Sequence, residues 1–189
     1  PVAVRVTEAP WTETQILKVG NGGELVVSFD EAVENDPHNP WGLDLLVFTN
    51  LGVASADWPT NDVVDSSGFA FGGLLGSISV SQDDVTWYRV ASLGTTFPMQ
   101  AYMAGASDAF ATGATATDYT LPVDPGLTMG DLAGLTVGQV ATLYNGSGGG
   151  LGIDLSNLLD GSGNPASLDW IRYVRIEGAT NVVDAFADV

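Results

Sequence analysis

The sequence predicts an all-β fold, an antiparallel two-sheet jelly-roll sandwich with one or two short helices. Short segments rich in Val, Ile, Leu and aromatic residues recur along the chain, and Gly, Asn, Asp or Pro bounds most of them. The 24 glycines suit a chain with many turns and suit a helical bundle poorly. Since neither an internal repeat nor a linker is visible, residues 1–189 are predicted to form a single domain.

The predicted strands are residues 2–7, 24–29, 43–48, 77–81, 86–91, 171–176 and 182–186. Apolar residues alternate with polar ones on both sides of residues 82–84, which read Gln-Asp-Asp. This pattern predicts a tight hairpin turn at residues 82–84. The spacing of the strands fits a jelly roll better than a closed barrel.

Helix is expected in only two places, residues 129–132 and residues 137–144. The second segment has Thr136 as a candidate N-cap, Asn145 and a following glycine as a stop, and apolar residues on one face. Residues 155–159 are expected to add a helical turn.

Charge and composition exclude several classes of function. The chain has 23 acidic and five basic residues, a net charge of −18, so no basic surface is available for nucleic acid or an anionic membrane. The absence of cysteine excludes thiolate chemistry and soft-metal sites. No stretch of about 18 apolar residues predicts a transmembrane helix. The acids are either a solvated surface or ligands gathered around Ca²⁺.

No catalytic arrangement is visible, and the chain is predicted not to be an enzyme. The only histidine, His38, lies in a turn-forming stretch between two prolines, where a catalytic triad would need a rigid base. Residues 147–150 form a glycine-rich loop without the lysine of a phosphate-binding loop. A secreted glycoside hydrolase ranks last, because no carboxylate pair has a setting that would raise a pKa.

Residues 30–44 are the predicted calcium site. Five carboxylates, two Asn amides and free carbonyls lie between two predicted strands and offer the hard oxygens that Ca²⁺ prefers. The expected ligands are Asp36, Asp44, Asp184, Glu34 and Asn39. The spacing does not match an EF-hand loop, and a turn with solvated acids explains the same residues equally well.

The tryptophans divide by context. Trp87 and Trp170 lie within strand patterns and are expected in the core. Trp41 and Trp58 lie in polar, proline-bearing loops, and Tyr102 lies in a stretch rich in small residues. These three are predicted to bind ligand, because exposed aromatic rings stack on sugars or contact proteins. Alternatively, the loop tryptophans cover the ends of the sandwich.

Several segments together resemble a family of secreted bacterial cell-surface proteins, many of which carry a C-terminal sorting signal of the PEP-CTERM kind. The similar segments are residues 22–30, 34–37, 39–44, 79–88, 148–155, 169–176 and 183–189. The resemblance implies a jelly roll similar to discoidin and carbohydrate-binding modules, often with a structural Ca²⁺. It also implies an extracellular or bacterial cell-surface location, but no specific activity.

The function expected from these observations is an extracellular or cell-surface binding module, glycan-binding or adhesive, with structural calcium. Its partner would be a polysaccharide or surface glycan. The alternative is a self-assembling subunit of a surface layer or filament, which would contact its own copies.

Overall fold

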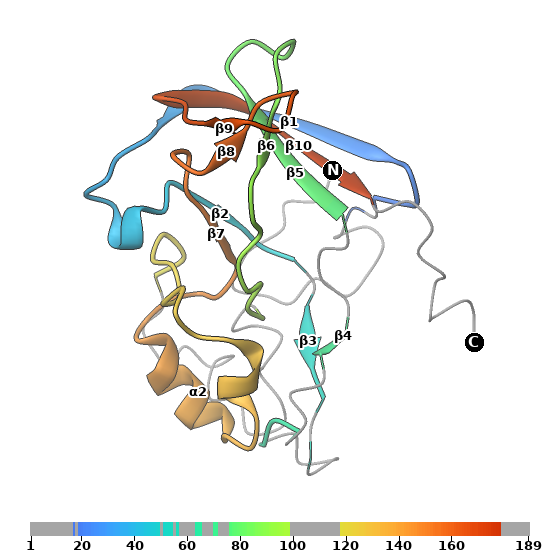
Figure 1. Ribbon diagram of the computed structural model, residues 1–189. Coiled ribbons are helices and arrows are strands. Elements are labelled where there is room, and N and C mark those ends of the chain that lie inside the picture. Colours follow the sequence, from blue (N-terminus) through green and yellow to red (C-terminus); the bar gives the residue numbers. More distant parts are fainter. Residues whose placement is uncertain are drawn as a thin grey trace. The chain divides into compact units, whose positions relative to one another are not determined.

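The computed structural model describes residues 17, 19–49, 51–54, 56, 63–65, 70–71, 76–98 and 118–178, in which strands predominate (Figure 1). The chain forms two compact units. The sheet unit takes its described residues from the stretches 19–34, 76–91 and 155–178. The helix unit takes its described residues from 17, 35–71, 92–98 and 118–154, with the gaps given above.

The sheet unit is a six-stranded antiparallel sheet in the order β1-β10-β5-β6-β8-β9. Its strands are β1 (Glu24–Glu34), β5 (Gly76–Ser81), β6 (Tyr88–Val90), β8 (Leu158–Leu159), β9 (Pro165–Ala166) and β10 (Trp170–Gly178). Val27 of β1 lies opposite Val174 of β10, which lies opposite Val80 of β5. Because side chains alternate along a strand, this register puts apolar residues of all three strands on one face, where Val80 and Val174 are buried.

The hairpin predicted around residues 82–84 forms between β5 and β6, but its connection spans residues 82–87 and is longer than the tight turn expected. Oδ1 of Asp83 accepts hydrogen bonds from the backbone N–H of Thr86 at 2.7 Å and of Val85 at 2.9 Å. Ser81 Oγ accepts from the backbone N–H of Asp83 and Asp84. The Thr86 and Val85 amides favour the charged form and lower the pKa of Asp83 to about 2.

This carboxylate makes stability depend on pH. The pKa of Asp83 in the folded chain, about 2, lies below its ordinary 3.8, so its contribution is present above pH 3.8 and is lost as the pH falls toward 2. Asp83→Asn is therefore expected to melt below the parent chain at neutral pH and at the same temperature near pH 2. Melting curves by circular dichroism check this, with Asp84→Asn as a control expected to change stability little. An equal deficit at both pH values would contradict the prediction.

The helix unit combines two short antiparallel strand pairs with the helices. Strand β2 (Leu45–Val47) pairs with β7 (Leu151–Ile153), and β3 (Gly52–Val53) pairs with β4 (Ala70–Phe71). The helices are the 3₁₀ turns η1 (Pro40–Gly42) and η2 (Met129–Leu132) and the α-helix α2 (Val137–Tyr144). Its core cluster consists of Val64, Phe97, Val123, Leu132, Val137, Val140, Ala141 and Tyr144.

Helix α2 forms where the sequence predicts it. Thr136 Oγ1 accepts from the backbone N–H of Gln139, and the Gln139 side chain accepts from the backbone N–H of Thr136, a complete capping box. The helix ends at Asn145, which has the left-handed conformation with φ 49°. The buried residues Val137, Val140, Ala141 and Tyr144 lie on one face.

The glycine-rich loop at residues 147–150 allows the ring of Tyr119 to pack closely against the backbone. An added Cβ at Gly148 would lie 2.3 Å from Cδ1 of Tyr119, whose ring meets Phe48 edge to face at 5.9 Å. The absence of a side chain at Gly148 therefore makes room for an aromatic ring from a distant part of the chain.

The all-β class is confirmed, and the strands within residues 24–29, 43–48, 77–81, 86–91 and 171–176 form. Two expectations are wrong. Residues 30–34 continue β1 instead of starting a loop. Residues 155–159 form a turn and strand β8, since Leu158 pairs with Val90 and Ala166. The predicted strands at residues 2–7 and 182–186 lie outside the described residues.

Candidate functional site

Among the described residues, an open groove in the helix unit has a volume of about 490 Å³. Its lining is mostly apolar, with two polar residues of different character, Asp124 and Asn145. The other lining residues are Pro40, Trp41, Leu121, Pro122, Leu127, Leu143 and Tyr144. A concave apolar surface with a few polar groups is the usual form of a small-molecule site.

Trp41 at the edge of this groove combines exposure with an unfavourable backbone conformation. It is 59% exposed, which is unusual for so large an apolar side chain. It also has φ 63° and ψ 10°, a left-handed conformation that costs free energy for a bulky residue. Such strain persists where surrounding contacts impose it, and it is concentrated at functional sites.

The residues predicted to bind calcium supply these contacts. Asp44 Oδ1 accepts from the backbone N–H of Asp36 at 2.8 Å and from Nδ2 of Asn39 at 3.1 Å. The backbone carbonyl of Asn39 accepts from the N–H of Gly42 at 2.8 Å, which closes the turn around Trp41. The tertiary structure thus brings Asp36, Asn39 and Asp44 together, and they hold the turn that carries the tryptophan.

Two further residues, Glu34 and Asp184, were predicted as metal ligands. Glu34 is the last residue of β1 in the sheet unit, and Asp184 lies outside the described residues. Among the described residues, no three His, Cys, Asp or Glu side chains gather into a group that could hold a metal ion. The calcium site stays a prediction.

Asp124 and Asn145 bring polar atoms to the groove. Asp124 Oδ1 accepts from the backbone N–H of Gly126 at 2.8 Å, whereas Oδ2 has no hydrogen-bond partner in the described part of the chain. The exposed side chain of Asn145 likewise has no hydrogen bond to the described residues. Both groups can bond a ligand: the Asp124 carboxylate as an acceptor, and the Asn145 amide as a donor and an acceptor.

Sequence reasoning missed the groove and its polar residues. Asp124 is one of several aspartates with a shared local role, in which a carboxylate oxygen accepts from the backbone N–H two residues further on. The pairs are Asp36 with His38, Asp83 with Val85, Asp118 with Thr120, Asp124 with Gly126 and Asp160 with Ser162. In all of these pairs except that of Asp83, the aspartate is next to Gly, Pro or Thr in a non-strand segment, and this was the signal that could have identified the turns.

Such hydrogen bonds also give several of the acidic residues a structural role. The Thr120 hydroxyl and N–H lower the pKa of Asp118, and bonds from the backbone and side chain of Asn164 lower the pKa of Asp160. The Thr128 hydroxyl and N–H lower the pKa of Asp131. In these turns the hydrogen bonds stabilise the charged form of the carboxylate.

His38 belongs to the turn that begins at Asp36. Its Nδ1 lies 2.8 Å from Asp36 Oδ1, and its side chain is 92% exposed. The backbone N–H and ring of His38 lower the pKa of Asp36.

The remaining predicted aromatic residues have mixed outcomes. Trp58 and Tyr102 lie outside the described residues. Trp87 and Trp170 were expected in the core, but both are half-buried. The Arg175 guanidinium lies 4.5 Å from the centre of the Trp87 ring, a cation–π contact that covers one side of the indole.

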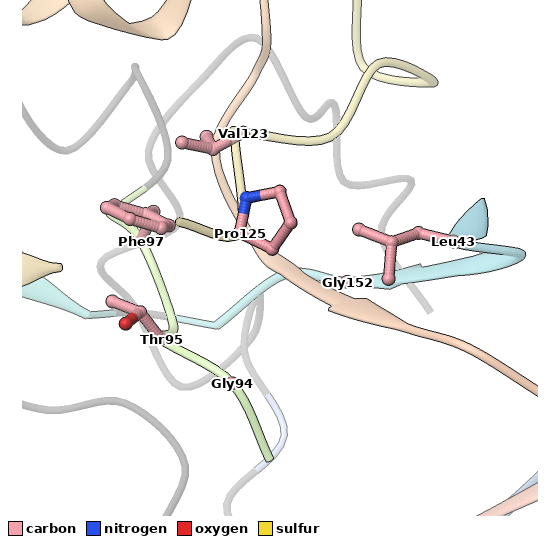
Figure 2. Close-up of a pocket in the computed structure, with 8 residues that line it drawn as sticks. Leu43, Gly94, Thr95, Phe97, Val123, Pro125 and Gly152 are labelled. Carbon is pink, nitrogen blue, oxygen red and sulfur yellow. The ribbon is translucent and has the colours of Figure 1, made fainter. Parts of the chain in front are cut away.

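A second hollow, drawn in Figure 2, is too small for an organic ligand. It has a volume of about 30 Å³ and lies among Leu43, Gly94, Thr95, Phe97, Val123, Pro125, Gly150 and Gly152. This volume admits one or two water molecules. The groove beside Trp41 is therefore the stronger candidate site.

Comparison of the chain with family models, with curated proteins and with solved structures finds no match. No helix within the described ranges has the length and apolar character needed to cross a membrane.

Proposed function

We propose that this chain is an extracellular or cell-surface binding module that holds a sugar ring of a polysaccharide or surface glycan in the groove beside Trp41. The observation that carries the proposal is the exposed indole of Trp41, held in a left-handed turn at the edge of an apolar groove. The apolar face of a pyranose ring stacks on an indole, and the rigid turn means that little conformational entropy is lost on binding.

The polar residues of the groove complement this stacking. Sugar hydroxyl groups both donate and accept hydrogen bonds. Oδ2 of Asp124 accepts, and the Asn145 amide donates and accepts. The two residues lie at the surface, where each direct bond contributes modestly and exchanges with water. The proposal therefore expects weak binding to one ring and stronger binding to insoluble or repeated glycans.

Trp41→Ala is expected to weaken glycan binding by about tenfold or more, because an aromatic residue that anchors a ligand contributes at least ~1.4 kcal/mol. Screening on a glycan array and on insoluble polysaccharides identifies the ligand, and calorimetry measures its affinity. Trp41→Phe keeps a ring and should retain part of the affinity. Val85→Ala, at another highly exposed residue, should change nothing. Unchanged binding by Trp41→Ala would place the ligand elsewhere.

Two parts of the proposal come from the sequence. The first is the jelly-roll arrangement, which the antiparallel pairing of all described strands supports. The second is a bound Ca²⁺, which the acidic composition of residues 30–44 supports.

One substitution tests the calcium prediction and separates metal binding from the hydrogen bonds that Asp44 makes within the loop. Asp44→Asn keeps an oxygen that can accept the bonds from Asp36 and Asn39, but it removes the charge that a dication needs. Calorimetric titration with Ca²⁺ is therefore expected to show binding by the parent chain and much weaker binding by Asp44→Asn. If titration of the parent chain with millimolar Ca²⁺ produces no heat of binding, the calcium prediction is wrong, and the role of Asp44 is limited to the hydrogen bonds of the loop.

A further inference from the structure

Among the described residues, no strand pairs with the outer side of β1. In the six-stranded sheet β1 is the outermost strand and pairs with β10, and it is 11 residues long. A strand at the edge of a sheet presents unpaired N–H and C=O groups that can pair with another extended chain.

The register shows which backbone groups of β1 point away from β10. Gly178 N–H donates to the carbonyl oxygen of Gly23 at 2.9 Å, and Glu24 lies opposite Glu177 in the adjoining pair. Hydrogen-bonded pairs alternate with non-bonded pairs in an antiparallel ladder. The backbone groups of residues 25 and 27 therefore point toward β10, and those of Glu24, Val26 and Ser28 point away from it.

The same stretch is apolar and accessible. Val26 and Val27 project to opposite faces of the sheet, and each is 40% exposed. Residues 25–28 contain no charge and no proline, and valine favours strands. Native edges are commonly blocked by proline, lysine or a bulge, and the first half of β1 has none of these, since its irregularity lies between Ser28 and Val33.

The charge of the strand decides between possible partners. Its exposed acids are Glu24, Asp30, Glu31 and Glu34, and it has no basic residue. A second copy that paired antiparallel along the whole strand would put Glu24 opposite Glu34, and like charges opposite one another are destabilising. The net charge of −18 adds to this repulsion.

We infer that the outer edge of β1 binds an extended, basic segment of another protein, which adds to the sheet as a further strand. Main-chain bonds to Glu24, Val26 and Ser28 supply the pairing, and apolar residues of the segment cover Val26 and Val27. Lysine or arginine on either side lies near Glu24 and Asp30. This is the strand-addition mode of peptide recognition.

The test uses the full chain and synthetic capped peptides. The probe is a fluorescent peptide with two central valines, flanking threonines and two lysines at each end. One matched peptide carries glutamates in place of the lysines, and another carries N-methyl groups on the central amides. Fluorescence anisotropy measures affinity at low and high salt. The protein variants are Val26→Pro, which removes an outward N–H, and Val85→Ala as a control at an exposed residue outside β1.

The lysine peptide is expected to bind, with affinity that falls as salt screens the charges. The glutamate peptide, the N-methylated peptide and the Val26→Pro variant should each reduce affinity by about tenfold or more, and Val85→Ala should not. The N-methylated peptide tests the pairing on the parent chain even where Val26→Pro fails to fold. Equal binding of the N-methylated peptide would show charge attraction without strand addition and overturn the inference. If the parent chain self-associates and Val26→Pro abolishes this association, a second copy is the occupant of the edge, and this result would also overturn the inference.

Discussion

Tyr144→Ala is expected to lower the free energy of unfolding by about 3–5 kcal/mol, the usual cost of removing a buried aromatic side chain. Tyr144 is 2% exposed and belongs to the core cluster of the helix unit. Its ring meets Phe97 edge to face at 5.9 Å, and its hydroxyl donates to the carbonyl oxygen of Pro98 at 3.0 Å. Alanine would leave a cavity among these residues and an unsatisfied buried carbonyl.

Tyr144→Phe is the matched control, because it keeps the ring and removes only the hydroxyl. It leaves the Pro98 carbonyl without its donor, so a loss of about 1–3 kcal/mol is expected, smaller than that of alanine. Urea denaturation followed by fluorescence measures both variants. Burial raises the pKa of Tyr144 well above its ordinary value, so absorbance titration should detect its ionisation only as the chain unfolds. A loss below 1 kcal/mol for alanine would contradict the packing described here.

Gly178→Ala is expected to lower stability by about 1–3 kcal/mol or more, because the added methyl group meets backbone that cannot rotate away. The new Cβ would lie 2.2 Å from the carbonyl oxygen of Gly20 and 3.0 Å from that of Val19. The turn before β1 or the end of β10 would have to move, and the bond from Gly178 N–H to Gly23 would weaken. The loss should appear in the same urea experiment.

Gly138→Ala is the control for that substitution. Gly138 lies on the exposed side of α2, and an added Cβ meets nothing within 4 Å. Alanine there should raise stability by about 0.4–1 kcal/mol, because it restricts the unfolded chain and favours helix. Equal stability of Gly178→Ala and the parent chain would show that the close approach to Gly20 is relieved without cost.

Trp41 shows how far sequence reasoning reaches into the site. Trp41 follows Pro40 in a polar, proline-bearing loop and has no apolar periodicity that would bury it, and the structure confirms its exposure. The groove could not be predicted, because Leu121, Leu143 and Asn145 are far from Trp41 in the sequence. Only packing within the helix unit brings them to one surface.

The acidic loop shows that composition alone does not decide whether a carboxylate binds a cation or accepts hydrogen bonds. Asp36 and Asp44 have the oxygens that a hard cation prefers, but the same oxygens accept hydrogen bonds from nearby amides. The sequence left these two interpretations open. The structure shows Asp44 bonded to Asp36 and Asn39, which positions the turn of Trp41.

The sequence by itself determined the features whose causes are local. Apolar alternation predicts strands, a turn that includes residues 82–84 joins β5 to β6, and Thr136 with Asn145 bounds α2, since neighbouring residues satisfy the free backbone groups. The tertiary structure decided that residues 30–34 extend β1, that residues 155–159 form a turn and strand, and that a groove lies beside Trp41. Those outcomes depend on pairing and packing between residues distant in the chain, and distant contacts override local preference.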